Sequence, residues 1–97
     1  MPQYITLANW TEQGIKNLKD APKRVEAANG MAAGFGGKLE SLYLTMGKYD
    51  LIFVTSFPND EGAAKFLYSL GRLGNIRTHT LKAFTQAEGL SLINSLQ

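Results

Sequence analysis

The run Leu51-Ile-Phe-Val54 constrains the fold of this chain more than any other feature, because all four residues are apolar. Successive side chains of a strand point to opposite faces of the sheet, so this run places apolar side chains on both faces. It is far shorter than the roughly 20 residues that a membrane span requires. The run therefore predicts a central strand in a sheet that is covered on both sides.

The rest of the chain divides into segments with a strand or helix pattern. Strands are expected over residues 3–9, 38–46, 49–57 and 76–84, and helices are expected to begin at the caps Thr11, Asp20, Asn59 and Thr85. The segment 38–46 alternates with period two, which places Leu39 and Leu42 on opposite faces. Gly47 and Lys48 then predict a two-residue type II′ hairpin to the next strand.

This order of elements predicts one α+β domain over residues 1–97 with a ferredoxin-like βαββαβ fold and a C-terminal helix. Right-handed crossovers give a four-stranded antiparallel sheet in the order 4-1-3-2. Two long helices cover only one face of such a sheet. We therefore expect a homo-oligomer in which the open sheet faces of two copies pack together.

Composition excludes several classes of function. The net charge is only +2 and the basic residues are scattered, which does not indicate nucleic-acid binding. Cysteine is absent and there is a single histidine, so we expect neither a metal site nor another cofactor. No segment has the pattern of a signal peptide or a membrane span, and we expect a cytoplasmic protein.

Three segments resemble the GYD-domain family, a group of small proteins without an assigned biochemical role. They are Thr11 to Leu18, the hairpin Gly47-Lys-Tyr-Asp50, and the run from Gly74 to Phe84, and the similarity covers nearly the whole chain. The resemblance implies a ferredoxin-like domain of the dimeric α/β barrel type. It implies no activity, because fold does not fix function.

The predicted topology brings the end of the first strand together with the starts of the third and fourth. The polar and aromatic residues expected near that rim are Asn9, Trp10, Gly14, Tyr49, Asp50, Arg77 and His79. An acid, two bases, an indole and an amide in one place suit a small planar or anionic ligand.

Each of these residues also has a purely structural interpretation. Asp50 accepts backbone amides or pairs with Arg77, Trp10 wedges between helix and sheet, and Gly14 permits a tight turn. Tyr49 is then a packing aromatic, and His79 an exposed or hydrogen-bonded strand residue.

We consider a non-enzymatic binding domain first and an enzyme second. The enzymes considered are monooxygenase-like or haem-degrading members of the dimeric α/β barrel type, although no motif matches them residue by residue. A tautomerase that uses Pro2 as an amino-terminal base is a further alternative, but Pro2 starts at the far end of its strand from Arg77 and His79.

Overall fold

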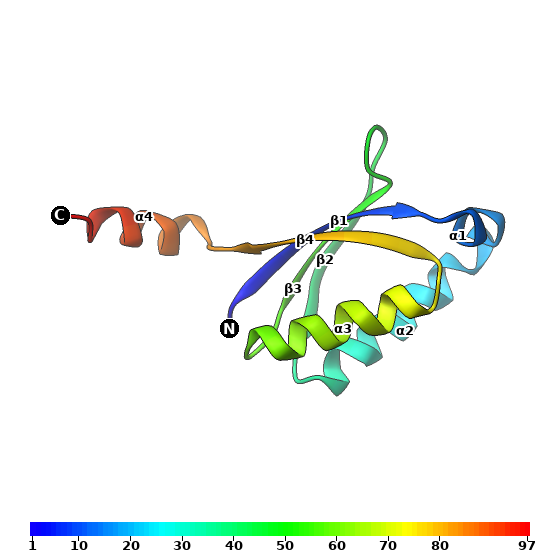
Figure 1. Cartoon of the computed structure of the whole chain (residues 1–97), viewed down its shortest axis with the longest axis horizontal. Coiled ribbons are helices and arrows are strands. Elements are labelled where there is room, and N and C mark those ends of the chain that lie inside the picture. The colour runs from blue at the N-terminus through cyan, green and yellow to red at the C-terminus, as the bar shows by residue number, and fades with distance from the viewer.

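A computed structural model describes all residues, 1–97. The elements in chain order are β1 (Gln3–Trp10), α1 (Glu12–Lys16), the 3₁₀ turn η1 (Leu18–Asp20), α2 (Ala21–Gly34), β2 (Lys38–Leu44), β3 (Leu51–Ser56), α3 (Asp60–Arg72), β4 (Ile76–Ala83) and α4 (Gln86–Asn94). Figure 1 shows α2 and α3 together on one side of the sheet.

The sheet has four strands in the order β2-β3-β1-β4, and every neighbouring pair is antiparallel. This confirms the predicted α+β class and strand order. Because β1 lies between β3 and β4, its end is flanked by the starts of both, with Asn9 opposite Arg77 and Ala8 opposite Leu51.

The core fills the space between the sheet and the two long helices. In β1 the side chains of Tyr4, Thr6 and Ala8 are buried at 5%, 0% and 0% exposure. Phe57 and Phe66 pack beside them, with ring centroids 5.3 Å apart. The Thr6 hydroxyl lies 2.9 Å from that of Thr80, so this polar group has a partner inside the core.

Strand β2 departs from the regular alternation expected of it. Its register with β3 shifts between Leu39 and Ser41, so that Leu39 opposes Thr55 and Leu42 opposes Phe53. An extra residue in one strand turns the following side chains to the other face. Leu39 and Leu42 consequently both pack against the core, and the prediction that they lie on opposite faces was wrong.

The connection between β2 and β3 is longer than the predicted two-residue hairpin. It covers residues 45–50, and Gly47 adopts a φ of +127°. The Thr45 amide donates to the Asp50 carbonyl at 2.8 Å and its hydroxyl to the Tyr49 carbonyl at 2.6 Å. The Asp50 amide instead donates to Ala8 of β1 at 2.9 Å, so Asp50 is tied to β1 as well as to the loop.

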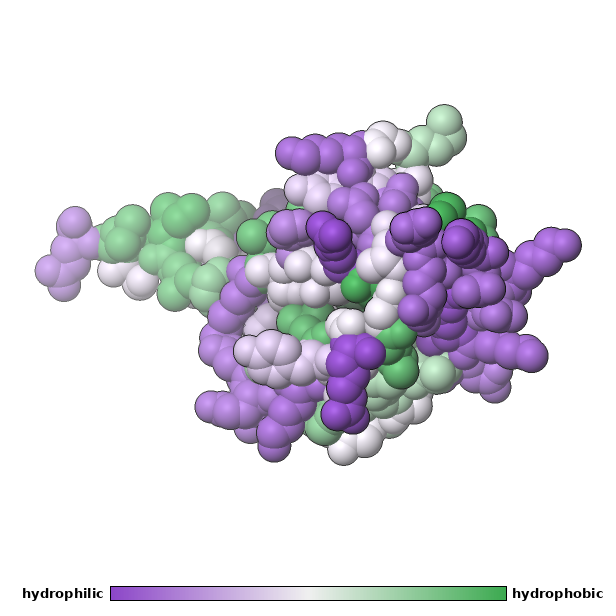
Figure 2. Space-filling model, turned by 45° about the vertical axis from the view of Figure 1, so that its right-hand side comes forward, coloured by the Kyte–Doolittle hydropathy of each residue, from purple (hydrophilic) through white to green (hydrophobic).

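Helix α4 extends away from the rest of the molecule (Figure 1). It begins with a capping box, in which the Glu88 amide donates to the Thr85 hydroxyl and the Thr85 amide to the Glu88 carboxylate. Leu90, Ile93 and Leu96 are 50%, 61% and 75% exposed. Figure 2 shows this apolar helix projecting from the body of the molecule. None of the helices combines the length and the hydrophobicity needed to span a membrane.

Candidate functional site

The sheet face opposite α2 and α3 carries apolar side chains that no helix covers. Ile5 and Leu7 alternate with the buried residues of β1, and the register places Ile52, Val54 and Leu81 beside them. Leu81 is 57% exposed. We call the surface formed by these five residues the open face.

Four of the predicted site residues lie at one end of the open face. Asn9 pairs with Arg77 across β1 and β4, and His79 pairs with Leu7 one step further along the sheet. The Tyr49 ring contacts His79 edge to face, with centroids 6.2 Å apart. Asn9, Tyr49, Arg77 and His79 together are called the polar rim.

Asp50 contributes to the backbone structure at this point. Its Oδ2 accepts the Trp10 amide at 2.9 Å, and the side chain is half-buried. No ion pair joins Asp50 to Arg77. The carboxylate therefore provides a hydrogen-bond acceptor for the Trp10 amide just outside β3, which begins at Leu51. This agrees with the structural interpretation of Asp50 as a residue that accepts backbone amides.

Trp10 lies on the other side of the sheet from the polar rim, and Gly14 lies in α1 beyond the end of β1. Trp10 follows Asn9 in β1, so its side chain points to the helix side, where the Arg24 guanidinium carbon is 5.9 Å from the ring centroid. Gly14 is buried, and a Cβ there would overlap the Asn75 carbonyl oxygen. Of the seven predicted residues, only the four of the polar rim therefore share one face of the sheet.

A second polar cluster connects β1, α3 and β4. The Tyr4 hydroxyl donates to Asp60 Oδ1 at 2.5 Å, and Lys82 Nζ lies 3.1 Å from the same oxygen. Burial and the Asp60 carboxylate raise the pKa of Tyr4 to about 12. The hydrogen bond from Tyr4 and the nearby Lys82 lower the pKa of Asp60. From sequence, Asp60 could be recognised only as a carboxylate in the first turn of a helix.

Pro2, near the amino terminus, lies apart from the polar rim. Pro2 accepts a hydrogen bond from the Phe57 amide at 3.1 Å, at the end of β1 remote from Arg77 and His79. No three His, Asp or Glu side chains come together as a metal site requires. The polar rim offers hydrogen-bond donors and a planar ring pair, which suit binding.

Comparison with known proteins identifies the family. The sequence profile of the GYD domain matches residues 4–93. This chain belongs to the GYD-domain family. A curated relative from Thermus thermophilus, named glutamine synthetase and cystathionine beta-lyase binding protein, is 28% identical over 89 residues, which is 91% of this chain and 94% of the relative.

Solved structures share the fold of this GYD domain. A protein of Thermus thermophilus superposes with a TM-score of 0.56 at 22% identity, over 87% of this chain and 94% of its own. The feast or famine regulatory protein of M. tuberculosis, solved with L-methionine, gives a TM-score of 0.67 at 15% identity over 89% of this chain. The GYD domain spans 52% of the length of that regulator.

Proposed function

We propose that this GYD domain is a self-associating binding domain. The observation that carries the proposal is the open face, which presents apolar side chains from three adjacent strands of one sheet. Contiguous exposed apolar surface marks interaction sites in soluble proteins. Completing the burial of a half-exposed leucine such as Leu81 contributes about 1 kcal/mol.

In this proposal the open faces of two copies pack together and form a dimeric α/β barrel. A sheet face is self-complementary about a twofold axis, since each copy presents the same surface to the other. Helix α4 follows β4, the edge strand that carries Leu81, so its exposed apolar side would extend the contact. The second copy then buries the outward-facing apolar residues of β3, Ile52 and Val54, just as α2 and α3 bury the inward-facing ones.

The polar rim lies at the end of this interface and is the proposed position of a small planar or anionic ligand. Arg77 is exposed and has no carboxylate partner, so its guanidinium is free to hold an anion. Tyr49 and His79 offer ring faces and edges beside it. Asp50, Trp10 and Gly14 then support the rim by fixing the end of β1 and the start of α1.

Substitution of the open face tests the assembly. Ile52→Lys places a charge on the open face, beside Leu7 of the neighbouring strand. We expect the mass measured by size-exclusion chromatography with light scattering to fall to that of one chain. The matched control is Tyr68→Lys, since Tyr68 is a 77% exposed aromatic on α3. An Ile52→Lys protein that keeps the mass of the unmodified oligomer would rule out the open face as the interface.

A thermal-shift panel of planar and anionic metabolites tests the polar rim. We expect at least one compound to stabilise the unmodified protein and to lose this effect in Arg77→Gln. A panel without any shift, together with no retained ligand in native mass spectrometry, would contradict ligand binding at the rim and leave assembly alone.

A second candidate function is the binding of a metabolic enzyme, which the name of the Thermus thermophilus relative favours. In this case the partner enzyme would occupy the open face in place of a second copy. Immobilised glutamine synthetase or cystathionine beta-lyase would then retain the unmodified protein and release Ile52→Lys. Equal retention of Tyr68→Lys and Ile52→Lys would contradict use of this face.

A further inference from the structure

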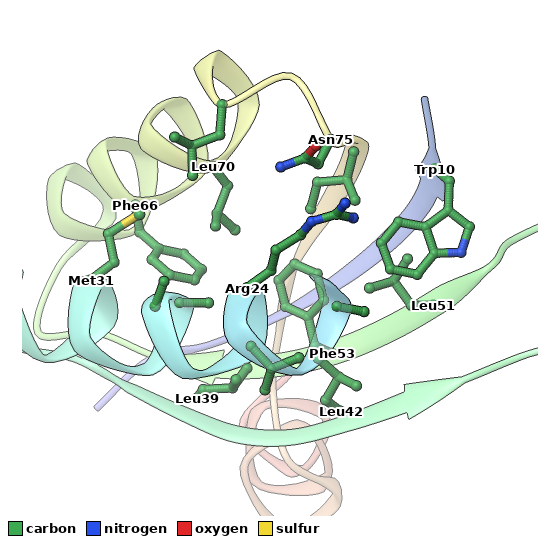
Figure 3. A pocket seen from close by; sticks show the side chains of 16 residues that line it. Trp10, Arg24, Met31, Leu39, Leu42, Leu51, Phe53, Phe66, Leu70 and Asn75 are labelled. Atoms are coloured by element: carbon green, nitrogen blue, oxygen red, sulfur yellow. The ribbon is translucent and has the colours of Figure 1, made fainter. Parts of the chain in front are cut away.

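A separate cavity lies inside the domain, between the sheet and helices α2 and α3. Its volume is about 120 Å³, and 14 of its 16 lining residues are hydrophobic. Leu42 and Phe53 form its sheet side, whereas Met31, Phe66 and Leu70 come from the helices (Figure 3). The cavity exists because α2 contributes mainly short side chains here, including Ala21 and Ala28.

Three residues with side-chain hydrogen-bond donors lie at one end of the otherwise apolar cavity, which we call its mouth. Arg24, Trp10 and Asn75 stand together at one end in Figure 3. The Arg24 guanidinium donates to the carbonyls of Gly14 at 3.2 Å and Asn17 at 2.6 Å, which uses two of its five N–H groups. It forms no ion pair with any carboxylate of this chain.

The other two residues at the mouth also have unused donors. The Asn75 side-chain oxygen accepts from Gln13 at 3.0 Å, while the amide nitrogen of Asn75 has no partner in the chain. The indole N–H of Trp10 donates to no protein acceptor either. A ligand head that enters this mouth must therefore accept hydrogen bonds, and the unpaired Arg24 charge favours an anion.

We propose that this cavity binds a small carboxylate with a short apolar body, whose carboxylate lies at Arg24 and whose body fills the space between α2 and the sheet. A 150 Å³ apolar cavity holds a benzene molecule, so 120 Å³ suits a branched chain of about four or five carbons. The cavity is on the opposite side of the sheet from the open face. One copy of the chain therefore holds the complete site, independently of self-association.

The fluorescence of Trp10, the only tryptophan in the chain, reports on this mouth. We expect 4-methylpentanoate to change the Trp10 fluorescence saturably. It should bind at least tenfold more tightly than the corresponding neutral amide, 4-methylpentanamide. Arg24→Gln should remove that preference, whereas Arg24→Lys should keep most of it. Ala28→Leu, which fills the cavity, should abolish binding of both compounds.

Lys23→Gln is the matched control, because Lys23 is an exposed neighbour of Arg24 on α2, and it should bind as the unmodified protein does. The absence of a saturable response to 4-methylpentanoate would overturn the proposal. So would a carboxylate preference that survives Arg24→Gln, or binding that survives Ala28→Leu in a protein shown by circular dichroism to be folded.

Discussion

Tyr4 and Asp60 show how a single contact can tie together segments that are far apart in the chain. Tyr4 is buried in β1, and its hydroxyl reaches the first residue of α3, whose carboxylate also meets Lys82 of β4. The contact sets the position of the start of α3 against the sheet. Its two pKa shifts make stability depend on pH at both ends of the scale.

In the acid range we expect stability to fall as pH drops through the lowered pKa of Asp60. The folded state holds this carboxylate ionised more strongly than the unfolded state does, so its contribution is present above the unfolded pKa and is lost on protonation. Urea unfolding at a series of pH values measures the effect. Tyr4→Phe should flatten the acid slope, and an unchanged slope would contradict a role for this hydrogen bond.

In the alkaline range we expect stability to fall as pH rises, because the pKa of Tyr4 is raised in the folded state. The pKa of Tyr4 is raised from 10.0 to about 12, so the folded state keeps the proton more tightly and its contribution is lost as pH rises from 10 toward 12. Tyrosinate absorbance should show one group that titrates late, and Tyr4→Phe should remove it. If Tyr4→Phe instead removes a tyrosine signal that titrates near 10, this would contradict the burial of the Tyr4 hydroxyl.

The close approach of α1 to the loop before β4 depends on Gly14. A side chain there would meet the Asn75 carbonyl, which already accepts the Thr11 amide at 3.0 Å. We expect Gly14→Ala to reduce the free energy of unfolding by about 1 to 3 kcal/mol, because the backbone must shift. Gly30→Ala is the control: it lies in α2 with open space around it and should stabilise by about 0.5 to 1 kcal/mol.

Helix α4 has a defined start but little packing of its own. A helix as short as 9 residues is marginal in water, and its apolar side chains are exposed. We expect a chain ending at Phe84 to fold, yet to associate more weakly than the full chain in light scattering. Equal association of the two would show that α4 takes no part in the interface.

The elements themselves could be predicted well from sequence, because caps, glycines and periodicity are local signals. Thr11, Asn59 and Thr85 all cap helices as expected. The bulge near Glu40 could not be predicted, since it is set by the fit of Leu39 and Leu42 to a core built from other segments. For the same reason the internal cavity was missed, as it depends on how α2 sits on the sheet.

The sequence predicts which strand ends meet at the candidate site, but not which of its side chains share a face. The predicted topology correctly placed the starts of β3 and β4 beside the end of β1. However, Asn9 and Trp10 are successive residues of a strand, so their side chains point to opposite faces of the sheet. The structure brings Asn9, Tyr49, Arg77 and His79 to one face. The Asp50 carboxylate instead accepts the Trp10 amide, and Gly14 packs against Asn75.

The helices cover only one side of the molecule's sheet. Both long helices lie on a single face of the sheet, while β3 carries apolar residues toward both faces. Its outward residues Ile52 and Val54 lie beside Leu7 and Ile5 of β1. One copy of the chain leaves this surface in contact with water, and that is the reason for expecting a second copy.

Sedimentation velocity of the unmodified protein over a range of micromolar concentrations tests directly whether a second copy covers the open face. We predict a dimer or larger assembly that persists on dilution through that range. A single species with the mass of one 10.6 kDa chain at every concentration would contradict the covered open face, and with it the proposed interface.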